Sequence, residues 1–364
     1  MDQSHHTMEY TTRIRVMRVD RLTGLETGVV QGIERGGSIT RNQDTSIGET
    51  ASLTIAGDLD LGTDLVRIWA DLDYENGDTE SIALGTFLPN AAKREIDGGA
   101  DSQPLDLYGR LRELQDSGFP TPVTLAAGSD PMAFIEEQIR ESGLGIAPHD
   151  ECTWRMGDQW TFGMDDDTRS SSRLNAINTL LDLIGWQSAR TDPMGSVVLQ
   201  PYTRPADRAP AWTFREGGGA RFLRSMTDER DWFDTKNEII VIYTGQDRDI
   251  RGHALDDDPD SMFSTVSRGR TISDTVVYND VPANMTDNEL QRMADDKASE
   301  LLATAQAVIR RITFTHLYAP ISPGDVITID YPSGQVNGDF SVRTQTISLT
   351  AGLPVECEAK SFSR

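Results

Sequence analysis

An internal repeat is the feature that most constrains this sequence. Residues 50–69 alternate β-branched or aromatic residues with polar ones around a Gly/Asp corner, and residues 311–331 repeat this pattern about 260 positions later. This spacing is too long for a solenoid, so the sequence predicts two related β-domains that flank a different segment. Gap-free alignment pairs Leu53 with Phe314, Thr54 with Thr315, Asp64 with Asp325, Val66 with Ile327, and Ile68 with Ile329.

The match resumes beyond a hairpin whose length differs between the copies. Gly85-Thr-Phe87 aligns with Gly338-Asp-Phe340, and each is followed by another alternating run, at 88–96 and 341–349. Chance is the alternative explanation, because alternating strands around a Gly-Asp turn are common.

The composition changes between the two copies, and this predicts three domains. Residues 1–118 read as strands with few helices, typical of a small barrel. Residues 119–218 read as a small α/β domain that ends in a Pro/Gly-rich linker at 201–219. Residues 219–364 contain the second copy and an inserted helix. The predicted fold is therefore mainly β with α/β parts: two related tube-type β-barrels flanking a small α/β domain.

Capping signals place three helices. Asp130-Pro131 is an N-cap followed by proline at the first helical position, and Gly143 is placed to end that helix. A second amphipathic helix is expected over 172–184. A capping box at 286–289 opens a long amphipathic helix that reaches residue 305.

Length and charge limit the class of protein. A chain of 364 residues has room for two to three domains without disulfides, and no apolar run approaches the roughly 20 residues that span a bilayer. Because Met1 to Tyr10 is polar, no signal peptide is expected, and the product should be soluble and made in a cytoplasm. The 58 acidic and 34 basic residues give a net charge of −24, which argues against nucleic acid as a ligand. This charge is compatible with nucleic acid as passing cargo, and simple solubility is the alternative.

The candidate metal and thiol sites do not have the required spacing. Cys152 and Cys357 are predicted to be free thiols, and the His5-His6 pair to be part of a disordered end. The acidic stretches at 71–75 and 256–260 lack the glutamate that a calcium loop needs at its twelfth position. The triplet at 165–167 is better explained by the dipole of a neighbouring helix. We therefore predict no metal site and no cofactor.

No catalytic motif is recognisable either. The sequence has no Gly-x-Ser-x-Gly, no His-Glu-x-x-His and no phosphate-binding loop. His316 aligns with Ile55 in the repeat, which favours a packing role. The sequence predicts a scaffold that is not an enzyme and has no catalytic residue.

The order of these parts resembles that of the baseplate hub proteins of bacteriophage tails. The resemblance rests on an N-terminal barrel with the phrase Gly37-Ser-Ile-Thr-Arg-Asn42, a middle α/β unit, and a second barrel with a helix. It implies a homotrimer in which each subunit supplies two tail-tube-like barrels, so that six barrels form a pseudo-hexameric ring around a DNA channel. Such a ring joins a six-fold tail tube to a three-fold tip, and the internal repeat is the feature that this geometry requires.

The same resemblance implies a location in the virion tail and a set of partners. These are the tail tube or distal tail protein, the tape measure protein, and a tip or fibre protein, with DNA as cargo and no membrane contact. Because the sequence ends at Arg364, directly after the second barrel, any enzymatic activity at the tip is expected to reside in another protein.

If DNA passes through such a ring, the acidic surplus should be present on the channel wall. Two other functions stay open: a cell-wall glycan hydrolase with two carboxylates facing a cleft, and a carbohydrate-binding module with exposed Trp154, Trp160 or Trp212. The channel-wall candidates are Asp64, Asp71, Asp73, Asp325 and Asp330.

Overall fold

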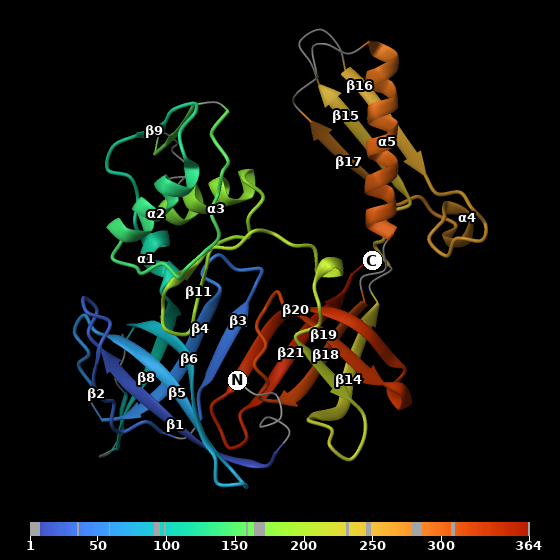
Figure 1. Ribbon diagram of the computed structural model, residues 1–364. Helices are drawn as coiled ribbons and strands as arrows, with labels where there is room; N and C mark the ends of the chain where they lie inside the picture. The colour runs from blue at the N-terminus through green and yellow to red at the C-terminus, as the bar shows by residue number, and fades with distance from the viewer. Residues whose placement is uncertain are drawn as a thin grey trace. The chain divides into compact units, whose positions relative to one another are not determined.

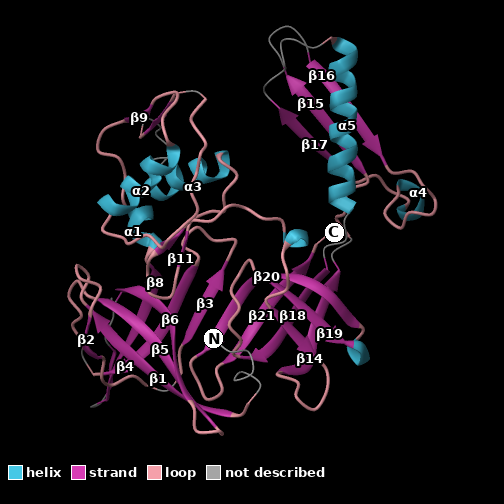
Figure 2. Ribbon diagram, viewed as in Figure 1, coloured by secondary structure: helices cyan, strands magenta, loops and turns pink. Residues whose placement is uncertain are grey.

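A computed structural model describes residues 8–34, 36–57, 59–90, 95–97, 100–157, 159–163, 172–230, 233–244, 249–278, 286–306 and 310–362. The chain is mainly β with a few helices, which confirms the predicted fold class (Figures 1 and 2). It divides into two compact units, Met1–Met226 with Thr313–Ala359, and Thr227–Ile312 with Lys360–Arg364. The predicted three-domain boundaries remain a prediction.

The strands of the first repeat copy belong to a 14-stranded sheet. Their apolar residues alternate with polar ones, and the buried side chains form one core that includes Val66, Ile68 and Phe87. The strands are β1 (Tyr10–Val19), β2 (Glu26–Val29), β3 (Ser38–Asn42), β4 (Glu49–Ala56), β5 (Leu65–Tyr74), β6 (Thr79–Asn90), β7 (Glu95–Asp97) and β8 (Ala100–Gly109).

The strands of the second copy continue the same sheet. In the described residues the pairings form an open path, β14-β18-β21-β20-β3-β4-β8-β6-β5-β1-β2, with branches at β13, β19 and β7. Barrel closure therefore stays a prediction. These strands are β13 (Trp212–Arg215), β14 (Phe222–Arg230), β18 (Arg310–Leu317), β19 (Val326–Tyr331), β20 (Val336–Ser348) and β21 (Pro354–Ser361), with a 3-10 turn at Pro332–Gly334.

The strand register confirms the internal repeat. In the first copy Val66 of β5 lies opposite Phe87 of β6, and in the second copy Ile327 of β19 lies opposite Phe340 of β20. These are the residues that the sequence alignment made equivalent. The order of neighbours also agrees, since β4-β8-β6-β5 in the first copy corresponds to β18-β21-β20-β19 in the second. Chance alternation does not account for matching register and matching strand order.

One ion pair occurs in both copies with its polarity reversed. Arg41 of β3 lies 3.9 Å from Glu49 of β4, measured from Nε to Oε2. In the second copy Arg310 takes the place of Glu49 at the start of the strand, and it contacts Asp228 of β14 at 2.8 Å. Strand β14 therefore corresponds to β3, with Asp228 at the position of Arg41.

The two copies are joined to each other within the sheet, where β20 pairs antiparallel with β3 (Figure 1). The Leu349 N–H donates to the Gly37 carbonyl, and the Gln43 N–H donates to the Arg343 carbonyl, both at 3.0 Å. Gly37 has a φ of 106°, and a Cβ there would lie 2.6 Å from the Ser52 carbonyl oxygen. Glycine is therefore required at the point where the junction begins.

The outermost strands distinguish the copies. β1 is antiparallel to β5, whereas β13 is parallel to β19. β13 lies inside the stretch at 201–219 that the sequence analysis treats as a linker, so that prediction is wrong for these four residues. The reason is packing, because Trp212 and Phe214 alternate with polar residues and are both buried.

A helical segment follows the first copy. Asp130 caps its second helix by accepting hydrogen bonds from the amides of Met132 and Ala133, as predicted. Ser172 caps the third helix by accepting a hydrogen bond from the Asn175 amide. Figure 1 shows the three helices grouped together. The elements are α1 (Leu111–Asp116), β9 (Val123–Leu125), α2 (Pro131–Glu141), β10 (Trp160–Phe162), α3 (Arg173–Leu183), β11 (Arg190–Thr191), β12 (Val197–Val198) and a 3-10 turn at Pro205–Asp207.

The smaller unit is a three-stranded sheet packed against a long helix. Ile239 and Val241 of the central strand pack with Ala298 and Leu302 of the helix. Its close packing depends on Gly252, because a Cβ there would lie 2.1 Å from the Ala294 carbonyl oxygen. The elements are β15 (Glu238–Thr244), β16 (Asp249–Leu255), α4 (Thr265–Arg268), β17 (Ser273–Tyr278) and α5 (Asp287–Gln306).

Candidate assembly surfaces

Asp71 lies on the face of β5 that points away from the core of the first copy, and its charge is paired. Arg15 donates to it twice, at 2.7 Å and 3.0 Å, Ser81 donates at 2.6 Å, and Arg13 lies at 3.4 Å. These contacts, led by the Arg15 hydrogen bonds, lower the pKa of Asp71 to about 2. The carboxylate is therefore ionised at every physiological pH but locally neutralised.

The chain itself covers part of this face. The Arg67 guanidinium is buried and donates to the Met194 carbonyl at 3.1 Å, and the Thr86 hydroxyl donates to the Pro193 carbonyl at 2.9 Å. Pro193 and Met194 belong to the turn between β11 and β12. The face that carries Asp71 thus contains arginines as well as acids, and one of these arginines lies beneath the helical segment.

Asp64 and Asp325 occupy the same turn in the two copies. The Asp64 amide donates to the Leu61 carbonyl and the Asp325 amide donates to the Ser322 carbonyl, both at 3.0 Å. The two turns lead into the equivalent strands β5 and β19. Asp64 is ion-paired with Arg18. The alignment therefore made two equivalent turn positions match, but the side chains act differently, because that of Asp325 accepts a hydrogen bond from the Ser322 amide.

The remaining two candidates differ in environment. Asp73 is exposed on β5. Asp330 lies opposite Arg215 across the β13–β19 pair, with 3.0 Å between Nε and Oδ2. Neighbouring arginines, which the sequence analysis did not assign, therefore accompany three of the five aspartates. Strand alternation placed Asp71 and Asp73 on one face, but no sequence signal identified the arginines on the adjacent strand. Whether the five line a channel stays a prediction.

A buried carboxylate anchors the helical segment to the first copy. Glu49 accepts a hydrogen bond from the Thr191 hydroxyl at 2.7 Å, and Arg41 is its nearest cation. Burial raises the pKa of Glu49 above its usual value. Arg110 makes a second link, donating to the Gly195 carbonyl at 3.5 Å.

The tryptophans of the carbohydrate-binding alternative are not equivalent. Trp212 is buried, Trp160 is half-buried against Phe162, and Trp154 is the exposed member. They do not form one aromatic platform.

His316 is a core residue, as the alignment with Ile55 suggests. Its ring lies 4.7 Å from Phe214 and 5.5 Å from Phe314, and burial lowers its pKa to about 4. Across the residues that the structure describes, no group of three potential metal ligands gathers. The triplet at 165–167 and His5-His6 lie outside the described residues.

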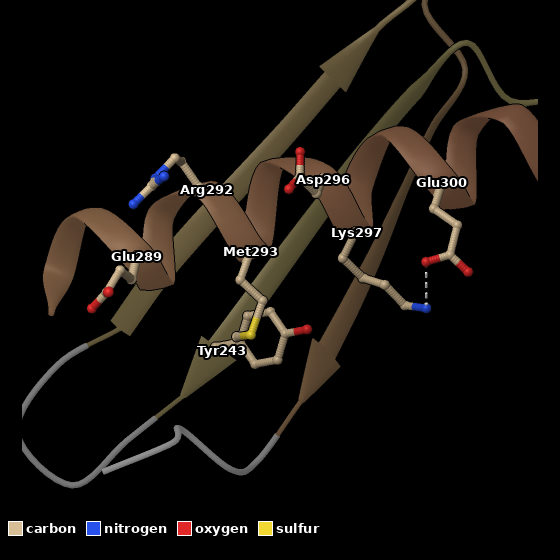
Figure 3. A pocket seen from close by; sticks show the side chains of 7 residues that line it. All are labelled: Tyr243, Glu289, Arg292, Met293, Asp296, Lys297 and Glu300. Carbon is tan, nitrogen blue, oxygen red and sulfur yellow. Dashed lines mark hydrogen bonds and ion pairs between the residues drawn. The ribbon is translucent and has the colours of Figure 1, made fainter. Parts of the chain in front are cut away.

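The smaller unit carries a shallow surface hollow of about 510 Å³ beside α5. Met293 and Tyr243 both line it, and Lys297 pairs with Glu300 at 2.9 Å (Figure 3). The other lining residues are Glu289, Arg292 and Asp296. The hollow is therefore mostly charged and carries no arrangement of nucleophile and base.

Comparison with known structures shows which proteins share this fold. A tail protein from Neisseria meningitidis superposes with a TM-score of 0.63 at 14% identity, covering 97% of this chain and 96% of the other. The chain has the fold of phage tail proteins. A 43 kDa tail protein of prophage MuSo2 from Shewanella oneidensis gives 0.62 at 9% identity, covering 96% and 98%. Prophage tail protein gp18 from Listeria monocytogenes gives 0.51 at 11% identity, covering 96% and 95%.

Sequence comparison adds no assignment, since no protein-family model and no curated protein matches this chain. Of the helices in the described residues, none is long and apolar enough to cross a membrane.

Proposed function

We propose that this protein is a structural, non-enzymatic hub of a phage-type tail. It would be made in the bacterial host and located in the virion. The observation that carries the proposal is the pair of repeat copies, which have the same strand register and lie side by side in one sheet. One chain thereby offers two similar surfaces to a neighbour. Three chains would offer six, which matches a three-fold hub to a six-fold tube.

The assembled state in this proposal is a homotrimer with a central passage for DNA. Its partners would be the tail tube or distal tail protein, the tape measure protein, and a tip or fibre protein. Support comes from the folds of the Neisseria and Shewanella tail proteins, which match this chain over nearly their whole length. The net charge of −24 is suited to a polyanion that must pass without being held.

Rotational averaging of electron micrographs of the purified particle, alone and with its tail-tube partner, tests this proposal. We expect three-fold or pseudo-six-fold classes around an open centre, and a mass of three chains by light scattering. A monomer or dimer under both conditions contradicts the proposal. Lysis of host cell walls that a single carboxylate substitution abolishes would favour the hydrolase instead.

A further inference from the structure

We propose that residues 148–155 form a pH-sensitive strap over the helical segment, and that protonated His149 fastens this strap. The inference is independent of the proposed trimer, because it concerns contacts within one chain. It rests on the hydrogen-bond partners of the two His149 ring nitrogens and on the few other contacts that hold the strap.

The strap lies between α2 and β10 and is anchored at its two ends. At one end the Ala147 N–H donates to the Val197 carbonyl at 2.8 Å, and at the other the Met156 N–H donates to the Ser129 carbonyl at 2.9 Å. Within the described part of the chain, no backbone hydrogen bond ties residues 148–155 to another segment. Side chains must therefore hold the strap down between its anchors.

Two side chains of the strap reach α2 and its N-cap. His149 Nε2 lies 3.1 Å from Glu136 Oε1, on α2. Arg155 Nη1 lies 3.4 Å from Oδ2 of Asp130, which caps the same helix. The His149 side chain is 15% exposed and that of Arg155 is 52% exposed, so His149 makes the better shielded and stronger contact.

Both ring nitrogens of His149 face oxygen atoms that accept hydrogen bonds. Nδ1 lies 2.9 Å from the Asp150 carbonyl oxygen, and Nε2 faces the Glu136 carboxylate. A neutral imidazole carries one N–H, so either tautomer leaves a lone pair pointing at an acceptor, and only the imidazolium donates to both. Because histidine changes its charge between about pH 5 and pH 8, we expect the fastening to weaken as the pH rises.

The charged groups around His149 leave Glu136 as its main partner. Arg140, also on α2, forms an ion pair with Glu136, but its side chain is 63% exposed and is screened by solvent. Trp186, which follows α3, presents an uncharged ring whose centroid lies 6.1 Å from that of His149. The Asp150 side chain is exposed. The charge of His149 is therefore coupled chiefly to the Glu136 carboxylate.

The strap covers apolar side chains of the helical segment. Cys152, in the middle of the strap, is half-buried against the core of this segment. Trp186, whose ring meets that of His149 edge to face, is 9% exposed. Loosening of the strap should expose both side chains. The strap would thus hide an apolar surface in acid and make it accessible at alkaline pH.

Cys152 is a built-in probe of the strap, because Cys357, the other cysteine, is buried in the core. Mass spectrometry can follow the rate at which a dithiodipyridine reagent modifies Cys152 in the whole chain between about pH 5.5 and pH 8.5. Division by the rate for glutathione at the same pH corrects for the growing thiolate content of a free thiol. We expect this ratio to rise about tenfold or more in the wild type, because the charged hydrogen bond is lost.

Variants assign the pH dependence to the strap. His149→Gln carries no titrating group and Glu136→Gln removes the carboxylate, so both ratios should change less than about twofold over this range. His253→Gln is the matched control, because His253 also lies 3.0 Å from a carboxylate, that of Glu238, but in the smaller unit. This control should keep the rise of the wild type.

A wild-type ratio that does not change with pH overturns the proposal, as does a rise of about tenfold that persists in either strap variant. Circular dichroism checks folding first, and if His149→Gln does not fold, Glu136→Gln decides alone. The hub proposal is unaffected by these outcomes, because the mass and symmetry of the particle test it separately.

Discussion

Arg15 holds Asp71 with two hydrogen bonds, from Nε at 2.7 Å and from Nη2 at 3.0 Å. They join β1 to β5, and the Asp71 side chain is only 9% exposed. The pair therefore contributes to the stability of the first copy rather than to a free acidic surface.

Replacing Asp71 by Asn should destabilise the protein by about 1–3 kcal/mol at pH 7, because the charge-assisted bonds to Arg15 are lost. The folded-state pKa of Asp71 is depressed to about 2, so its contribution is complete above its unfolded value of 3.8 and is lost as the pH falls to about 2. Urea unfolding of the wild type and Asp71→Asn should show that their difference in unfolding free energy becomes smaller as the pH falls from 7 to 2. Asp73→Asn, on the same strand but exposed, is the control and should change the unfolding free energy by less than about 0.5 kcal/mol.

The stability that Glu49 contributes should depend on pH in the opposite direction. Since burial raises its pKa, the wild type is most stable, relative to Glu49→Gln, below the unfolded value of 4.5, and it loses that stability as the pH rises through the folded value. Glu49→Gln should therefore gain stability relative to the wild type as the pH rises from 4.5 to 8. Glu137→Gln, exposed on α2, should show no such trend. If the difference in unfolding free energy between Glu49→Gln and the wild type stayed constant across this range, the raised pKa of Glu49 would be contradicted.

Gly252→Ala tests the packing of the smaller unit. The added methyl would meet the backbone of Ala294, which cannot yield like a flexible side chain, so α5 must move away from β16. We expect a loss of about 1–3 kcal/mol or more in the unit's stability. Hydrogen exchange measured by mass spectrometry should show faster exchange in α5 and β15. Gly218→Ala, where a Cβ meets nothing within 4 Å, should exchange like the wild type.

Asp73→Lys is the cleanest charge reversal among the channel-wall candidates, because Asp64, Asp71 and Asp330 are ion-paired with arginines. If Asp73 faces the passage, the trimer should remain assembled and acquire DNA binding that weakens with added salt. Fluorescence anisotropy of labelled DNA at about 50 and 200 mM salt measures this. Glu137→Lys is the matched control. Equal DNA binding by both variants would contradict the prediction that Asp73 lies on the channel wall.

The alternation of side chains explains how much of the fold could be predicted. The repeat gave the strands β4, β5, β18 and β19 because burial on one face enforces a period of two. The helix start at Asp130 followed from capping chemistry, which is local, and the start near Ser172 followed from the spacing of apolar residues along the helix.

The β3–β20 junction could not be predicted. It depends on backbone hydrogen bonds between segments about 300 residues apart, and backbone groups are the same for nearly every residue type. The arginine partners of the acidic candidates were missed for a related reason. Arg15 and Asp71 meet only because β1 pairs with β5, and sequence spacing carries no information about that contact.

The reversed polarity of Arg41–Glu49 and Asp228–Arg310 has an evolutionary consequence. We expect an exchange of gene segments between the two halves to bring Arg41 opposite Arg310, where like charges repel across neighbouring strands. Such a like-charge pair should lower the stability of the recombinant by about 0.2–1 kcal/mol. Sequences of related tail genes should therefore show the two charges of each pair changing together.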